Sequence, residues 1–232
     1  EGRLRPAVWK LAWPTMITNI IGGLQGIVDH VMVGRYVGFA ANAGIGVATQ
    51  IWIVVIVFMM SVFTGMSILV ARFVGAGEED KADRTVYQAF LVAMGMSVGI
   101  MAPLGYFAAP WLLNFVNAAP LVQAEALPYL RIMFLFSSGM LMFFMLGGAL
   151  RSPGDARTPM VLGIVMTVLN VLFNIVLIRG MGPIPAYGTA GAAIGTILAS
   201  GIVGLHAVWE LWTGGGVVSF PRNHRFAPCL GM

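Results

Sequence analysis

The run AGIGVATQIWIVVIVFMMSVFTGMSILVARFV, from Ala43 to Val74, contains a single charged residue, Arg72, which lies close to its end. A bilayer core about 30 Å thick is crossed by a helix of about 20 apolar residues, so this run is long enough to span a membrane. Its apolar residues are continuous rather than alternating, which excludes the strand of a transmembrane β-barrel. The run therefore predicts a membrane-spanning α-helix.

The same pattern recurs along the chain, and charged or Pro- and Gly-rich links separate the apolar runs. The six predicted spans cover residues 7–33, 43–74, 85–115, 128–150, 159–178 and 189–212. We therefore expect an all-α integral membrane protein whose residues 1–213 form one bundle of six transmembrane helices. Residues 214–232 are glycine-rich and then polar, which predicts a cytoplasmic linker.

Composition supports a membrane protein and excludes several other classes. Hydrophobic residues make up 59% of the chain and charged residues 9%, whereas roughly 25% are charged in a soluble domain. The net charge of +4 comes from scattered basic residues that form no patch interleaved with stacking aromatic residues, so we expect no nucleic-acid partner. One cysteine, Cys229, and three scattered histidines provide neither a disulfide framework nor a metal site. We expect no cofactor and no enzymatic activity.

The distribution of basic residues predicts the orientation of the chain, because cytoplasmic loops are enriched in Lys and Arg. One alternating set of segments holds Arg3, Arg5, Lys10, Arg72, Lys81, Arg84, Arg151, Arg157, Arg222 and Arg225. The other set holds only Arg35, Arg131 and Arg179. This bias predicts a multi-pass protein of the plasma (inner) membrane with both termini in the cytoplasm.

Asp29 is the clearest candidate for a functional residue, because it is an acid near the outer end of the first span. Placing an ionisable group at membrane depth costs about 2.5–3.5 kcal/mol on insertion scales, so such groups usually serve transport. An acid that is alternately buried and hydrated can bind and release a proton, as a proton-coupled carrier requires. The alternative is an interfacial acid paired with His30 or Arg35.

Other polar residues in the spans could complete a site around this acid. Asn170 and Asn174 are four residues apart and share a helix face, and Thr196 lies in the sixth span. Hydrogen bonding between helices is the alternative role for these residues. Asn19, Gln25 and Gln50 are further polar residues, for which we favour packing between helices. Pro14 removes a hydrogen bond from the first span and permits a bend.

Several motifs, in order along the chain, resemble the multidrug and toxic compound extrusion (MATE) family. They are Trp13-Pro14-Thr15, Ile27-Val28-Asp29-His30-Val31-Met32-Val33-Gly34, Ala43-Gly44-Ile45-Gly46-Val47-Ala48, Tyr129-Leu130-Arg131-Ile132, Leu150-Arg151-Ser152-Pro153-Gly154-Asp155-Ala156-Arg157-Thr158-Pro159 and Gly188-Thr189-Ala190-Gly191-Ala192-Ala193-Ile194-Gly195-Thr196. No motif is specific by itself, but together they cover nearly the whole chain in the order found in that family.

The resemblance implies one lobe of a two-lobe antiporter that exports cationic or amphipathic drugs in exchange for protons or sodium. It implies that Asp29, Asn170 and Thr196 belong to the ion-coupling cluster of the N-terminal lobe, and that Pro14 is a hinge. Its partners would be the lipid bilayer, drug-like small molecules and a second lobe, either missing from this chain or supplied by an identical copy.

Two departures from the family pattern limit what the resemblance implies. Asn174 stands where many members carry a second aspartate, which weakens the expectation of sodium or of two protons. The chain is also about half the family's length, which leaves a non-transporting fragment or an assembly subunit as an alternative. A lipid-linked sugar flippase of the same superfamily is a second alternative, although such proteins usually carry more basic residues in the cleft.

Overall fold

The computed structural model describes residues 4–151 and 155–213, and these residues form an all-helical bundle. Its elements are α1 (Leu4–Tyr36), α2 (Phe39–Gly75), α3 (Glu79–Met94), the π-helical η1 (Gly95–Met101), α4 (Ala102–Phe115), α5 (Pro120–Leu135), α6 (Ser138–Arg151), α7 (Arg157–Arg179) and α8 (Gly188–Thr213). Helices satisfy every backbone hydrogen bond internally, which the interior of a bilayer demands of apolar runs such as these.

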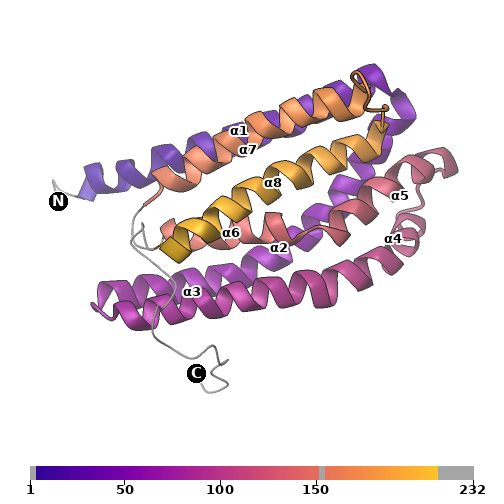
Figure 1. Ribbon diagram of the computed structural model, residues 1–232. Coiled ribbons are helices and arrows are strands. Elements are labelled where there is room, and N and C mark those ends of the chain that lie inside the picture. Colours follow the sequence, from indigo (N-terminus) through magenta and orange to yellow (C-terminus); the bar gives the residue numbers. More distant parts are fainter. Residues whose placement is uncertain (1–3, 152–154, 214–232) are drawn as a thin grey trace.

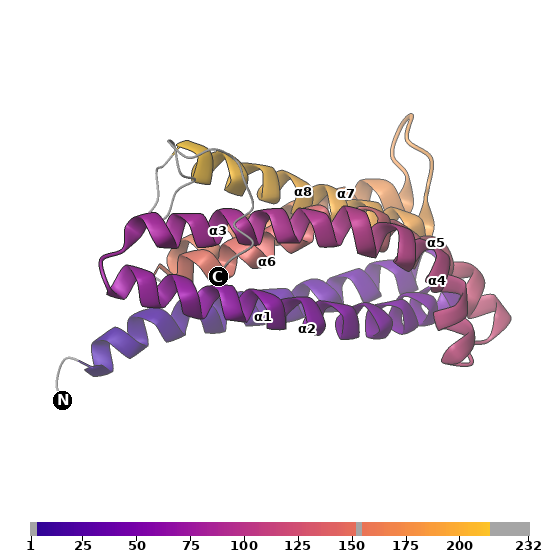
Figure 2. The same cartoon turned by 90° about the horizontal axis from the view of Figure 1, so that it is seen from below.

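Five or six membrane crossings account for the described residues, where the sequence predicted six. Five stretches are long and apolar enough to cross a membrane, and α5 and α6 form a sixth crossing if this pair, bent by 57°, is a single span. The helices run side by side, and the start of α1 and the end of α8 lie at the same end of the bundle (Figure 1 and Figure 2). That arrangement fits an even number of crossings. The predicted linker at 214–232 lies outside the described residues.

The third and fourth spans differ most from the predicted ranges. The third runs without interruption from Glu79 to Phe115, because η1 adopts the wider π geometry just before Pro103. The fourth begins at Pro120, eight residues before the predicted start, and bends at Phe136 and Ser137. Proline suits the first turn of a helix, where its missing N–H has no acceptor to bond, so Pro120 begins the span.

A cluster of three hydroxyl groups joins these two irregular spans. The Ser97 hydroxyl of η1 lies 2.8 Å from that of Ser137 and 2.9 Å from that of Ser138, at the bend between α5 and α6. Ser97 and Ser137 are fully buried. The hydroxyl groups at the π-helical segment and at the bend between α5 and α6 therefore bond to one another instead of facing lipid.

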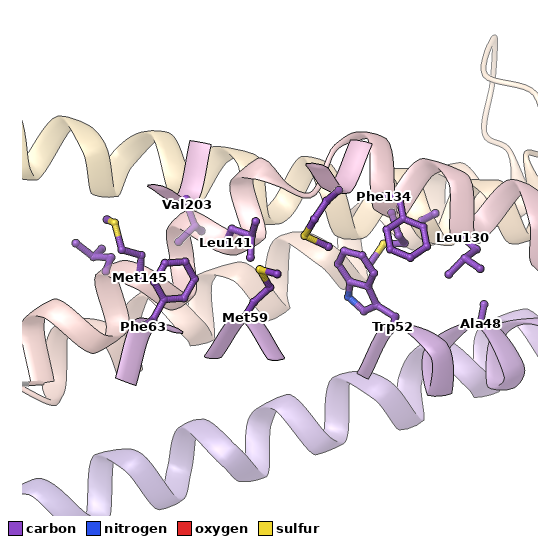
Figure 3. Close-up of a cluster of buried hydrophobic side chains, with 14 of the residues drawn as sticks. Ala48, Trp52, Met59, Phe63, Leu130, Phe134, Leu141, Met145 and Val203 are labelled. Carbon is purple, nitrogen blue, oxygen red and sulfur yellow. The ribbon is translucent and has the colours of Figure 1, made fainter. Parts of the chain in front are cut away.

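The hydrophobic core lies between α2 and the α5–α6 pair, with α8 closing one side (Figure 3). The labelled side chains in this view are Ala48, Trp52, Met59 and Phe63 from α2, Leu130 and Phe134 from α5, Leu141 and Met145 from α6, and Val203 from α8. Trp52 meets Phe134 edge to face, with ring centroids 5.3 Å apart. Gly105 of α4 leaves room for the Phe134 ring, because a Cβ atom there would overlap it. These contacts hold the bent span against α2 and α4.

Asp155 begins the fifth span by accepting hydrogen bonds from the first turn of α7. The N–H groups of Arg157 and Thr158 donate to its Oδ1 at 3.0 and 3.1 Å, and the Thr158 hydroxyl donates to its Oδ2 at 2.6 Å. Partial burial would raise the pKa of Asp155, but these hydrogen bonds and the charge of Arg157 outweigh it and lower the pKa below its usual 3.8. The carboxylate therefore stabilises the start of the helix.

We expect Asp155→Ala to lower the free energy of unfolding by about 1 kcal/mol, because the first turn loses its acceptor. Asp155→Asn keeps one acceptor oxygen and should lose less. Because the folded-state pKa is lowered, the stabilisation is complete above pH 3.8 and is lost as the pH falls through the folded-state value. Unfolding in mixed detergent micelles, followed by circular dichroism, measures these differences. Equal stability of all three proteins at neutral pH would contradict this role.

Candidate functional site: a carboxylate–amide network beside a cavity

Asp29 of α1 contacts α7 through the amide of Asn174. The Asn174 Nδ2 group donates to Asp29 Oδ1 at 2.6 Å and lies 3.2 Å from Asn170 Oδ1. The Asn170 Nδ2 group donates in turn to the Thr196 hydroxyl of α8 at 2.9 Å. The structure thus brings Asp29, Asn174, Asn170 and Thr196 into one hydrogen-bonded chain across three helices.

Because most of these polar groups are buried, the loss of any one hydrogen bond between them is costly. Asn170 and Asn174 are fully buried, and Thr196 is 9% exposed. The Thr196 hydroxyl lies 3.0 Å from the Ala192 carbonyl of its own helix, to which it can donate while accepting from Asn170. The Asn174 Oδ1 atom is buried without a hydrogen-bond donor. An unpaired buried polar atom costs about 1–3 kcal/mol, so the position of this amide carries a cost in stability.

Close packing between α7 and α8 fixes the position of Asn174. A Cβ atom on Gly195 would overlap Asn174 Oδ1, so only glycine leaves room for the amide at this crossing. One turn earlier, a Cβ atom on Gly191 would lie 2.6 Å from the Leu177 carbonyl oxygen. Gly191 and Gly195 therefore set the distance between α8 and the amide.

A cavity of about 780 Å³ adjoins the network, and Asp29 and Thr196 contribute to its lining. Its wall is largely apolar, with aromatic and methionine side chains from α2, α5, α6 and α7 that include Trp52, Met60, Phe63, Met133, Phe143 and Met166. Among the described lining residues Asp29 is the only acid, and none is Lys or Arg. The cavity thus combines adaptable apolar walls with one negative group.

The structure also places the remaining predicted polar residues. Asn19 and Gln25 line the cavity, and Gln25 accepts a hydrogen bond from Thr167 of α7 at 3.0 Å. Gln50 is exposed on the outside of the bundle. Pro14 is buried within an unbroken α1, so the structure contains no break at the predicted hinge. The proposed roles of the four network residues and of Pro14 stay predictions.

Sequence reasoning missed two parts of this site. Tyr129 of α5 is buried near Asp29, and its side chain hydrogen-bonds that of Thr49 of α2. A tyrosine in an apolar span, whose hydroxyl needs a partner, was the available signal. His30 lies against α2, with its Nδ1 atom 2.6 Å from Asn42 Oδ1. It therefore bonds a neighbouring helix, rather than pairing with Asp29 as the alternative reading supposed.

Comparison with known proteins assigns the chain to a family. The family model MatE matches residues 14–176. "Probable multidrug resistance protein NorM" of Thermotoga maritima is 29% identical over 198 residues, which are 84% of this chain and 42% of that protein. "Multidrug resistance protein MdtK" of Edwardsiella ictaluri is 30% identical over 186 residues, which are 80% of this chain and 40% of that protein. The chain spans about half the length of the curated relatives that it matches.

The fold agrees with this assignment. A crystal structure described as MATE in the bent conformation superposes with a TM-score of 0.85 at 21% identity, covering 97% of this chain and 49% of that one. The expected all-α membrane fold and the resemblance drawn from the motifs are both confirmed. The chain is a transmembrane protein that belongs to the MATE family.

Proposed function

We propose that this chain is the N-terminal lobe of a secondary active antiporter that exports cationic or amphipathic drugs in exchange for protons or sodium. The carboxylate of Asp29, held by Asn174 at the wall of an apolar cavity, is the observation that carries the proposal. The names of the matching relatives, which are multidrug resistance proteins, support it. Family membership alone supports transport rather than enzymatic catalysis.

The chemistry of the cavity favours a cation as cargo. A single negative group among aromatic and methionine side chains attracts positive charge and adapts to varied apolar shapes. A lipid-linked sugar flippase carries a phosphorylated cargo, for which basic side chains would be expected. The described lining contains none.

In the mechanism that we propose, Asp29 either binds the coupling ion or attracts a cationic drug electrostatically. Ion binding at Asp29 changes the hydrogen bonds to Asn174, and through Asn170 this change reaches Thr196 of α8. The drug leaves the cavity, and rocking of two lobes around a central cleft exposes the site to the other side. A potential of 100 mV supplies about 2.3 kcal/mol per charge, so one ion drives a modest drug gradient.

This mechanism needs a second lobe, which forms the opposite wall of the cleft. We propose that the partner is either the second lobe of a two-lobe transporter or an identical copy of this one. We further propose that the protein lies in the plasma (inner) membrane with both ends of the described bundle on the cytoplasmic side. The excess of basic residues at that end supports this orientation.

Reconstitution into vesicles tests the proposal. We expect an imposed proton or sodium gradient to drive ethidium movement in the opposite direction, both for this chain and for a two-lobe transporter that carries it. Vesicles with equal ion concentrations on the two sides are the control. No ethidium movement under either gradient, combined with transfer of a fluorescent lipid-linked sugar between leaflets, would replace the antiporter with the flippase.

A further inference from the structure

Arg131 is a cation in the fourth span, on the side of α5 that points away from the centre of the bundle. Leu121 and Leu135 on the same side of this helix are 70% and 40% exposed, as expected of a face that meets lipid. Arg131 itself is half-buried between α5 and α4. An arginine among apolar side chains in a span is costly unless a partner satisfies its charge.

The protein satisfies only part of this side chain. Its guanidinium carbon lies 4.5 Å from the centroid of the Tyr106 ring in α4, a cation–π contact. Its Nε atom is buried and has no hydrogen-bond acceptor. Within the part of the chain that the structure describes, no carboxylate lies at ion-pair distance from it. A guanidinium group carries five N–H donors, and because Nε is buried, the four on the terminal nitrogens are the ones open to an outside acceptor.

Exposed aromatic residues near the end of α4 mark the level of the lipid headgroups, within about two turns of Arg131. Trp111 and Phe115 stack on each other, with centroids 5.7 Å apart, on the last turns of α4. Both are largely exposed, and tryptophan favours the level where hydrocarbon meets headgroups. Tyr106 lies five residues before Trp111, which is about 7.5 Å along a helix. The Arg131 guanidinium lies at the level of the Tyr106 ring, so a phosphate that binds it would lie about 7.5 Å along α4 from Trp111.

We propose that Arg131, held by Tyr106, binds the phosphate of a phospholipid headgroup in the leaflet next to the α4–α5 turn. Arginine pairs with phosphate through two parallel hydrogen bonds, and basic pockets between spans recognise lipid headgroups in this way. The acyl chains of the same lipid would lie along the exposed Leu104 and Phe107 of α4. This site lies on the outer face of the bundle, and neither Arg131 nor Tyr106 lines the cavity beside Asp29.

Native mass spectrometry of the delipidated 232-residue chain in detergent tests the site, with phosphatidylglycerol as the probe. We expect one tightly retained lipid per chain, and about a tenfold weaker affinity in Arg131→Gln. Diacylglycerol with the same acyl chains should not be retained. Arg35→Gln is the matched control, because Arg35 is an exposed arginine at the same end of the bundle, and it should bind as the parent does.

Three results would overturn the proposal. They are equal lipid retention by Arg131→Gln, equal retention of diacylglycerol, and displacement of the lipid by millimolar inorganic phosphate, which would indicate a site for soluble anions. If Arg131→Gln does not fold, Tyr106→Leu decides, because it keeps the charge and removes only the ring. That variant should weaken lipid binding about two- to fivefold, and unchanged binding would refute the site. Drug transport is not measured, so the antiporter proposal stands or falls separately.

Discussion

Asp29→Asn should abolish ion-coupled drug efflux while leaving the lobe folded. Asparagine has nearly the same shape and still offers an oxygen to the Asn174 amide, which donates to Asp29 Oδ1 at 2.6 Å. It carries no charge, so it cannot exchange a proton and attracts a cation far more weakly than a carboxylate does. Efflux of ethidium under an imposed ion gradient, in a two-lobe transporter that carries this lobe, should fall to the level of empty vesicles.

Glu125→Gln provides the control for this experiment. Glu125 is also an acid within a helix of the bundle, but its Oε2 atom accepts from the Thr189 hydroxyl at 2.9 Å and it does not line the cavity. The control variant should keep most of the efflux. Parental efflux in Asp29→Asn, with a folded protein, would remove Asp29 from the mechanism.

Gly195→Ala should impair transport nearly as strongly, although the added group is a single methyl. That methyl would overlap Asn174 Oδ1, and the Asn174 amide cannot turn away without losing its hydrogen bonds to Asp29 and Asn170. Overpacking of this kind costs about 1–3 kcal/mol of stability. We expect a lower melting temperature in detergent together with loss of coupled efflux.

Gly201→Ala separates the clash from the general effect of alanine in a helix. Gly201 lies on the same helix, α8, and a Cβ atom there would have no neighbour within 4 Å. Alanine favours a helix over glycine by about 1 kcal/mol, so this control should be as stable as the parent or more so. Equal behaviour of the two variants would show that the position of Asn174 does not matter.

The sequence predicted the apolar spans and the partners of Asp29 because both depend on local patterns. Continuous apolar runs define spans, and two amides four residues apart must share a helix face. The contact between Asp29 and Asn174 needed only the further assumption that buried polar groups find one another. Family resemblance selected Asn170 and Thr196 from the many polar residues in the spans.

Other features depend on packing that no local pattern encodes. The third span contains Pro103 and Pro110, yet the helix continues past both, and a π-helical segment lies just before the first of them. The early start of the fourth span was hidden because Gln123 and Glu125 make its first turns polar. The role of Tyr129 depends on which helices α5 meets, and spacing along the chain does not reveal that.

The π-helical segment η1 determines which side chains the second half of the third span, α4, presents to its neighbours. One additional residue in a turn rotates everything after it by about 100° around the helix axis. Without that residue, the Tyr106 ring would point away from Arg131, which it now covers at 4.5 Å. The π-helical segment that contains Ser97 therefore sets the rotation of α4 about its axis and decides which of its side chains face α5 and which face outwards from the bundle.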